Sequence, residues 1–141
     1  MASVPFHYVD LRAFSYGTED DDRVEAALRE YLPEEATVER AESEGHHGDR
    51  ICVFSARLEN ADDVRHVLSK IATLADIDEV RAELSDRVDD NCSFFLTLDK
   101  QRAYEGIVER GDGITLRAKV EAYPATREGA IENARAALDA L

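Results

Sequence analysis

The sequence predicts one α+β domain over residues 1–141, a two-layer sandwich in which a mostly antiparallel or mixed sheet of about five strands carries helices on one face. Two observations lead to this prediction. Several segments alternate apolar and polar residues with a period of two, which is typical of strands that bury one face. Between them lie segments whose apolar residues recur every three or four positions, which is typical of amphipathic helices. A chain of 141 residues also has the usual size of one domain.

The first segment with period-two alternation covers residues 6–16 and predicts a strand. Its apolar register includes Val9 and Leu11, which we expect to face the core. Thr18 then offers an N-cap to a helix whose acidic first turn suits the positive end of the helix dipole. Pro33 lies just past the predicted end of this helix.

A hairpin and a second helical region follow. Residues 36–42 form a weak strand pattern and residues 51–58 a stronger one, with a glycine-flanked turn between them. Asn60 can cap the next helix, whose apolar residues form one stripe. A further turn or two of helix is predicted over residues 77–84.

The last third predicts two strands and a helix. Residues 92–98 alternate, and residues 114–123 form the most regular alternating segment of the chain. Pro124 ends this strand, and Thr126 can cap a final helix. The predicted sheet therefore has one face covered by helices and one face that is open or meets a partner.

The composition is strongly acidic. The chain has 31 Asp and Glu against 17 Lys and Arg, a formal net charge of -14, and only Lys70, Lys100 and Lys119 are lysines. Because the acids are spread along a chain that is 44% hydrophobic, we expect a folded domain with an acidic surface rather than a disordered tail. Surplus carboxylates with few lysines resemble the composition of halophilic proteins, and at about 1 M salt the Debye length falls to about 3 Å, which screens their repulsion. The alternative is an ordinary acidic cytosolic protein.

Thiols and apolar runs limit the remaining classes. Cys52 and Cys92 lie in apolar strand patterns without CxxC spacing, so buried free thiols are favoured over a disulfide or metal pair. The N-terminus lacks a signal segment, and no apolar run approaches the roughly 20 residues that span a bilayer. A cytoplasmic protein with no membrane partner is expected.

Catalytic and metal motifs are scarce. The turn Gly45-His46-His47-Gly48 places two imidazoles side by side, which could ligate a metal or move protons. No HExxH, CxxC or third well-spaced ligand accompanies them, and no nucleophile elbow, phosphate loop or dinucleotide fingerprint occurs. The sequence therefore favours a structural or ligand-contacting turn, with no catalytic residue, metal or cofactor.

The polar side of the predicted strands carries cations interleaved with aromatic rings. Single-stranded RNA recognition on sheets uses this combination, since bases stack on rings while Arg or Lys meets phosphates. Packing against a helix is the alternative explanation for the aromatic residues. The candidate residues on the strands are Tyr8, Arg12, Arg57, Arg117, Lys119 and Tyr123, and a second basic cluster after the fourth strand contains Lys100 and Arg102.

Several segments in order resemble an archaeal RNA-binding domain family, also known as predicted exosome subunits, and the composition is similar to that of a haloarchaeal member. The resemblance covers nearly the whole chain. It implies a fold similar to that of the ribosomal protein that binds 5S rRNA, and RNA binding without catalysis. Lys100, Gln101 and the turn residues are carried over as motif positions. The matching segments are residues 6–14, Thr18-Glu19-Asp20, Gly45-His46-His47-Gly48, Asp99-Lys100-Gln101 and Ala103-Tyr104.

These observations predict a non-catalytic RNA-binding protein in RNA processing or ribosome-related work, with RNA and the exosome or other RNA-processing proteins as partners. A protein-interaction adaptor attached to an RNA-processing complex is the first alternative. A small metal-dependent hydrolase centred on His46 and His47 is the second, and it lacks its remaining ligands.

Overall fold

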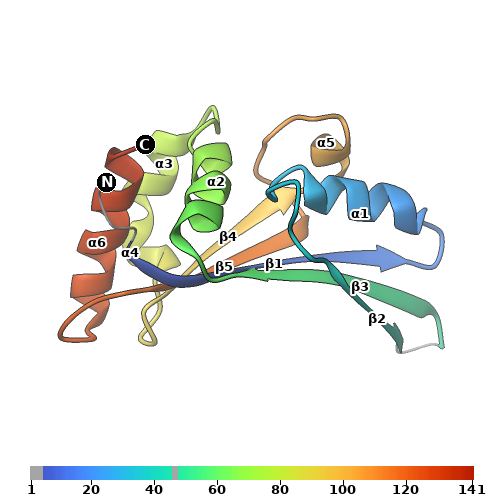
Figure 1. Cartoon of the computed structure of the whole chain (residues 1–141), viewed down its shortest axis with the longest axis horizontal. Helices are drawn as coiled ribbons and strands as arrows, with labels where there is room; N and C mark the ends of the chain where they lie inside the picture. The colour runs from blue at the N-terminus through green and yellow to red at the C-terminus, as the bar shows by residue number, and fades with distance from the viewer. Residues whose placement is uncertain (1–4, 46–47) are drawn as a thin grey trace.

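A computed structural model describes residues 5–45 and 48–141 and shows a five-stranded sheet in the order β2-β3-β1-β5-β4 (Figure 1). All four strand pairings are antiparallel. The predicted α+β class is therefore confirmed, and of the two sheet types the antiparallel one is found. The strands are β1 (Phe6–Tyr16), β2 (Glu39–Glu44), β3 (Arg50–Leu58), β4 (Ser93–Asp99) and β5 (Gly113–Val120).

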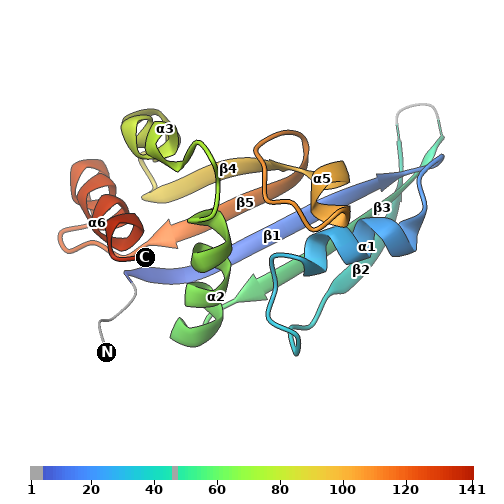
Figure 2. The same ribbon diagram turned by 90° about the horizontal axis from the view of Figure 1, so that it is seen from above.

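The helices lie on one face of this sheet, as Figures 1 and 2 show. In Figure 2, α1 and α5 cover one end of the sheet, α3 and α6 lie at the opposite end, and α2 crosses the sheet between them. In Figure 1 none of the helices formed by residues 5–45 and 48–141 lies beneath the sheet, so this part of the chain leaves the second face open. The helices are α1 (Asp21–Arg29), α2 (Ala61–Ile71), α3 (Ile77–Ala82), α4 (Leu84–Arg87), α5 (Lys100–Tyr104) and α6 (Arg127–Asp139).

The core lies between the sheet and the helices. Leu11 of β1 pairs with Ala56 on one side and with Leu116 on the other, and Leu116 pairs in turn with Leu96. All four side chains are buried, so this row of the sheet presents a continuous apolar surface to the helices. Burial of a leucine side chain contributes about 1.5–3 kcal/mol, which makes the apolar register the main determinant of which sheet face is covered.

Local boundaries differ from the prediction where side-chain caps decide them. The N-cap of α1 is Asp20, whose carboxylate accepts from the Asp22 N–H, and not Thr18. A short helix, α5, follows β4 directly because the Asp99 carboxylate accepts the Arg102 N–H and caps it. The last strand ends at Val120, so Tyr123 lies in the loop before α6.

Both cysteines are buried and free, as predicted. His46 and His47 lie outside the described residues; of their turn, Gly48 donates its N–H to the Gly45 carbonyl at 3.0 Å. Within the described ranges no group of three His, Cys, Asp or Glu could hold a metal ion. The helices described are all too short or too polar to cross a membrane.

Candidate nucleic-acid interface

The sheet face that the described helices leave open carries the outward side chains of the strands. This open face bears Arg12, Arg57, Phe95, Arg117 and Lys119. The strand pairing aligns residues that are distant in sequence. Asp10 of β1 lies opposite Arg57 on β3 and opposite Arg117 on β5, and Arg117 lies opposite Phe95 on β4. One row across four strands thus contains two guanidinium groups, one carboxylate and one phenyl ring.

Arg57 is held in place by its neighbours. Its guanidinium donates from Nε and Nη2 to the two Asp10 carboxylate oxygens, at 2.7 and 2.8 Å. The same guanidinium lies 4.0 Å from the centre of the Tyr8 ring. The hydrogen bonds to Asp10 raise the pKa of Arg57 further above its ordinary value. The charge of Arg57 is therefore already matched, and one face of the Tyr8 ring is covered.

Arg12 and Arg117, unlike Arg57, have no carboxylate partner among the described residues. Of the basic side chains, only Arg12, Arg117 and Arg135 have no hydrogen bond or ion-pair partner among the residues that the structure describes. Arg12 lies opposite Thr115, and Arg117 stands two positions further along the same strand. Both are exposed. In a chain with a net charge of -14, two arginines without a partner among the described residues thus occupy neighbouring positions on the open face.

Lys119 and Phe95 extend this region toward the edge of the sheet. Lys119 lies opposite Tyr8 and donates its ammonium to the Asn91 carbonyl. Phe95 is 42% exposed although it sits within β4. Phe95 is not among the site residues predicted from the sequence. The period-two alternation that places Phe94 in the core also points Phe95 outward, so the sequence pattern alone could have identified Phe95 as an exposed ring.

A shallow hollow lies on the other half of the open face, along β1 and β3. Its volume is about 470 Å³, and Arg12, Ser55 and Arg57 line it. Two carboxylates, Glu39 and Glu59, line the same hollow. The half of the face formed by β1 and β3 therefore mixes charges of both signs, unlike the half around Arg117.

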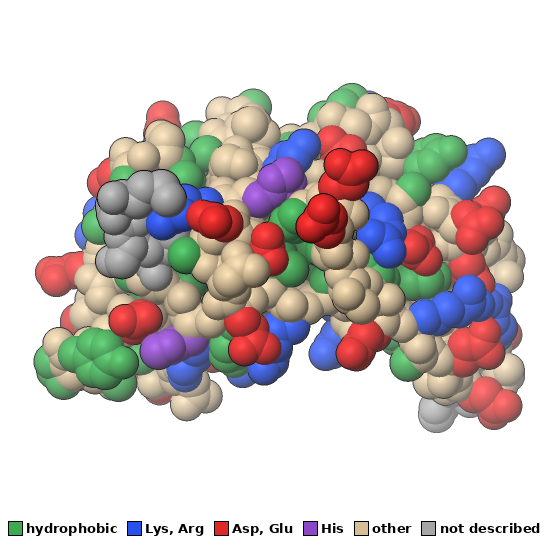
Figure 3. Space-filling view, in the orientation of Figure 1, with side chains coloured by type: hydrophobic (Ala, Val, Ile, Leu, Met, Phe, Trp, Pro, Cys, Tyr) green, Lys and Arg blue, Asp and Glu red, His purple; other side chains and the backbone are tan. Residues whose placement is uncertain are grey.

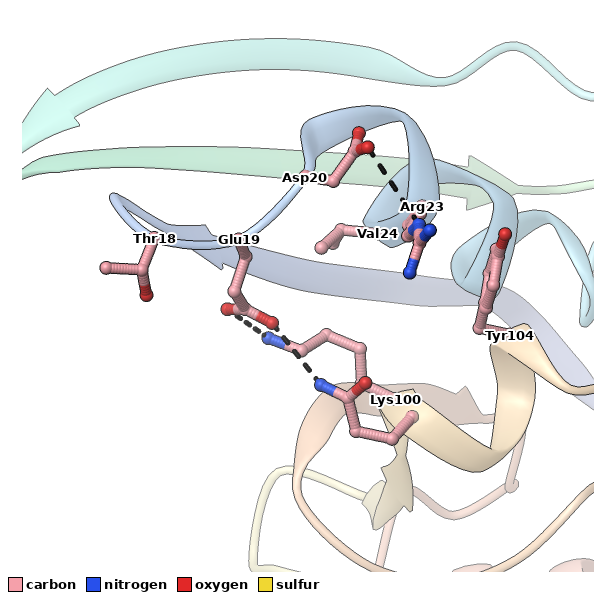
Figure 4. A pocket seen from close by; sticks show the side chains of 8 residues that line it. Thr18, Glu19, Asp20, Arg23, Val24, Lys100 and Tyr104 are labelled. Atoms are coloured by element: carbon pink, nitrogen blue, oxygen red, sulfur yellow. Dashed lines mark hydrogen bonds and ion pairs between the residues drawn. The ribbon is translucent and has the colours of Figure 1, made fainter.

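The second predicted basic cluster lies elsewhere, on α5 beside the start of α1 (Figure 4). Lys100 points toward Glu19, and its ammonium donates to the Glu19 carboxylate at 2.8 Å and to the Phe14 carbonyl at 2.7 Å. Gln101 donates to Glu19 at 3.5 Å. Arg102 is paired with carboxylates at 3.1 and 3.3 Å. Lys100, Gln101 and Arg102 therefore lie outside the open face. The predicted residues that the structure does bring together there are Tyr8, Arg12, Arg57, Arg117 and Lys119.

The α1–α5 junction also contains a hollow of about 300 Å³. Arg23 and Tyr104 line it, and the Arg23 guanidinium lies 5.3 Å from the centre of the Tyr104 ring. Asp20 forms a longer ion pair with Arg23, at 3.9 Å (Figure 4). The cations of this hollow are therefore already engaged within the protein.

Elsewhere on the surface, acidic and basic side chains are interspersed (Figure 3). Arg110 illustrates the pattern, since its guanidinium contacts Asp76 at 2.7 Å, Glu79 at 3.1 Å and Glu83 at 3.3 Å. Tyr123, the last predicted site residue, is 83% exposed in the loop after β5. An open antiparallel sheet with unpaired guanidinium groups beside exposed rings is typical of α+β domains that bind nucleic acid.

Comparisons with known proteins agree with this class. The chain belongs to an RNA-binding family, because a family model described as RNA binding matches residues 8–120. An RNA-binding protein of Pyrococcus abyssi is 30% identical over 140 residues, which are 92% of this chain and 91% of that protein. The resemblance to an RNA-binding family with archaeal members is thereby confirmed, and the family and homologue names point to RNA binding rather than catalysis.

Solved structures of archaeal proteins share the whole fold. A DUF54 protein from Methanothermobacter thermautotrophicus is 43% identical with a TM-score of 0.80, and the match covers 94% of this chain and 98% of that one. A protein from Archaeglobus fulgidus, described as DUF54, is 27% identical with a TM-score of 0.84, and the match covers 94% and 99% of the two chains.

Proposed function

We propose that this protein binds RNA through the open face of its sheet and does so without catalysing a reaction. The observation that carries the proposal is the pair Arg12 and Arg117, two exposed guanidinium groups with no partner among the described residues. Guanidinium groups pair with phosphates in a bidentate geometry and are always charged. Arg57, Lys119, Tyr8 and Tyr123 are proposed as further contacts, each requiring less rearrangement than the buried Lys100.

Replacing both Arg12 and Arg117 by alanine is expected to weaken RNA binding about tenfold at roughly 0.2 M KCl and to lower the slope of log K against log salt by about 1–2. With each phosphate contact that is lost, binding releases fewer counterions from the RNA. The difference in affinity between the double variant and the unaltered protein should therefore shrink as the salt concentration rises. Fluorescence anisotropy with a labelled RNA measures both quantities.

Arg135→Ala is the matched control for this double variant. Arg135 is exposed on α6 and also has no partner among the described residues, but it does not lie on the open face. If Arg135→Ala weakened binding as much as the double variant, net charge rather than the open face would be responsible. If the unaltered protein bound no RNA below about 100 μM, direct RNA binding would be abandoned.

We further propose a halophilic source, on the basis of the net charge of -14 and the three lysines. Raising KCl from about 0.1 to about 2 M is then expected to raise Tm by roughly 5–10 °C, since screening weakens repulsion among the carboxylates. Circular dichroism melts measure the shift, and a neutral osmolyte at matched osmolality controls for effects other than screening. A protein with its highest Tm at low salt would contradict this proposal.

For the cellular role we propose cytoplasmic RNA processing or ribosome-related work, with the exosome or other RNA-processing proteins as partners; this rests on the family resemblance. The adaptor alternative predicts that these partners stay bound after nuclease treatment of a native extract. Loss of the partners on nuclease treatment would favour binding through RNA.

A further inference from the structure

Phe95 is an exposed phenyl ring in the middle of a strand. Burial of a phenyl side chain is favourable, so a 42% exposed Phe on a regular strand indicates a ring that the fold itself does not need to cover. β4 forms one edge of the sheet, and Phe95 pairs with Arg117 on its inner side. A direct antiparallel pair places the two Cα atoms about 5 Å apart, so the Arg117 side chain leaves the sheet next to the Phe95 side chain.

The surroundings of Phe95 are cationic and rich in hydroxyl groups. In the next row of the sheet Thr97 lies opposite Thr115, and both are exposed. Arg12 lies on the far side of Thr115. The outward positions of β4 and β5 hold one acidic residue, Asp99, whose carboxylate is engaged in capping α5. The outward residues of β4 and β5, together with Arg12 of the neighbouring β1, therefore offer a ring, two guanidinium groups without a partner among the described residues, and hydroxyl donors, while Asp10 of β1 is paired with Arg57.

We propose that Phe95 is a stacking platform for an unpaired base and that the substrate class of the open face is single-stranded RNA, an inference that rests on the proposed function. A base in a duplex is already stacked on its neighbours, so a ring on a flat sheet can stack only on a base that is unpaired. A base on Phe95 brings its phosphates toward Arg117 and Arg12, and the threonine hydroxyls can meet its polar edge or a 2′-hydroxyl.

The charge of the protein supports the same substrate class. Duplex RNA recognised by phosphate contacts alone needs many cations, and the affinity from counterion release falls steeply with salt. This face has two unpaired guanidinium groups against a net charge of -14. Stacking does not depend on counterion release, so it can supply affinity where the phosphate contacts are few.

Anisotropy titrations with a labelled single strand of about eight nucleotides and a blunt-ended duplex of the same base composition test the inference. We expect the single strand to bind at least about tenfold more tightly than the duplex at roughly 0.2 M KCl. Phe95→Ala should weaken single-strand binding by about 5- to 150-fold, the range measured for loss of one base–ring stack, and leave duplex binding unchanged. Phe95→Tyr should keep the affinity, because its ring is retained.

Tyr104→Ala is the matched control for Phe95→Ala. Tyr104 is 48% exposed, similar to Phe95, but it lies on α5, away from the open face. Unchanged melting curves for Phe95→Ala and Phe95→Tyr confirm that their folds are intact. The inference is overturned if the duplex binds as tightly as the single strand, or if Phe95→Ala binds the single strand within about twofold of the unaltered protein. The proposed function survives either result if the Arg12 and Arg117 double variant still loses affinity.

Discussion

Replacing Lys100 by methionine is expected to lower the free energy of unfolding by about 2–3 kcal/mol, more than any other lysine substitution in this chain. The Lys100 side chain is 9% exposed, and its ammonium forms an ion pair with Glu19, which is 23% exposed. Methionine has a similar length but cannot donate, so Glu19 would keep its negative charge in a partly buried place without a cation. Removal of one partner of a fully buried pair costs about 3–5 kcal/mol, and the partial exposure of Glu19 reduces this value.

The geometry around Lys100 explains why the effect should be large. The side chain passes Gly113, at the start of β5, where an added Cβ would lie 2.6 Å from the Lys100 Cβ. It then reaches the Phe14 carbonyl, which lies on β1 beyond Ala13, the last residue of that strand to pair with β5. Burial acts to raise the pKa of Glu19, but hydrogen bonds from Lys100 and the Tyr16 backbone, together with the charge of Lys100, outweigh it and hold this pKa below its ordinary value.

Urea denaturation near pH 7 measures the expected loss, and two further variants test its cause. Lys70→Met is the matched control, because Lys70 is 34% exposed and its pair with Glu30 spans 3.5 Å; such surface pairs contribute about 0–1 kcal/mol. Adding Glu19→Gln to Lys100→Met should restore part of the stability, since the unpaired charge is removed. A Lys100→Met variant whose free energy of unfolding lies within about 1 kcal/mol of the unaltered protein would contradict this account.

The same ion pair makes stability depend on pH. Since the folded-state pKa of Glu19 is lowered, the contribution of Glu19 to stability is present above the ordinary value of 4.5 and is lost as the pH falls through the folded-state pKa.

The fold was predictable because its main determinants are local. Residues 8–16 alternate, and the predicted apolar register is buried in the structure from Val9 to Ala13; a register shift between Phe6 and Tyr8 interrupts the alternation at the start of the strand. The helices that Asn60 and Thr126 cap were found for the same reason, since each cap acts within three residues. The first cap was misplaced because Thr18 and Asp20 are both good N-cap residues, and the choice depends on where the chain turns after β1.

The candidate site was predictable only in part, because its chemistry depends on which strands become neighbours. Sequence alternation put Arg57 and Arg117 on the same side of the sheet. It could not show that Asp10 lies between them and neutralises Arg57, because this requires the pairing of β1 with both β3 and β5. The burial of Lys100 likewise comes from a contact with Glu19, 81 residues away in sequence.

Raising the pH from about 10 to about 12 is expected to remove about 2 kcal/mol of stability through Tyr31 alone. Tyr31 follows α1 and its side chain is fully buried. Burial raises the pKa of Tyr31 to about 12, and the nearby Glu30 and Asp99 carboxylates act in the same direction. In the unfolded chain its pKa is about 10, so between these values the unfolded state loses the phenolic proton while the folded state keeps it.

The sign of this effect follows from proton binding. Where the folded state binds more protons, stability falls as pH rises, by about 1.4 kcal/mol per pH unit for one group. The contribution of Tyr31 is therefore fully present below about pH 10 and is lost as the pH rises through about 12. Urea denaturation at a series of pH values measures the slope, and Tyr31→Phe, which cannot ionise, should remove about one unit of proton release from it.

Tyr123→Phe is the matched control for Tyr31→Phe, because Tyr123 is 83% exposed and its side chain changes environment little on folding. This variant should keep the full loss of stability above about pH 10, whereas Tyr31→Phe should reduce it by about 1.4 kcal/mol per pH unit. If the two variants gave the same slope, the phenol of Tyr31 would have to ionise in the folded state as it does in the unfolded chain. The end of α1 would then be open to water, and the apolar layer between α1 and the sheet would be thinner at this end than the buried row from Leu11 to Leu116 implies.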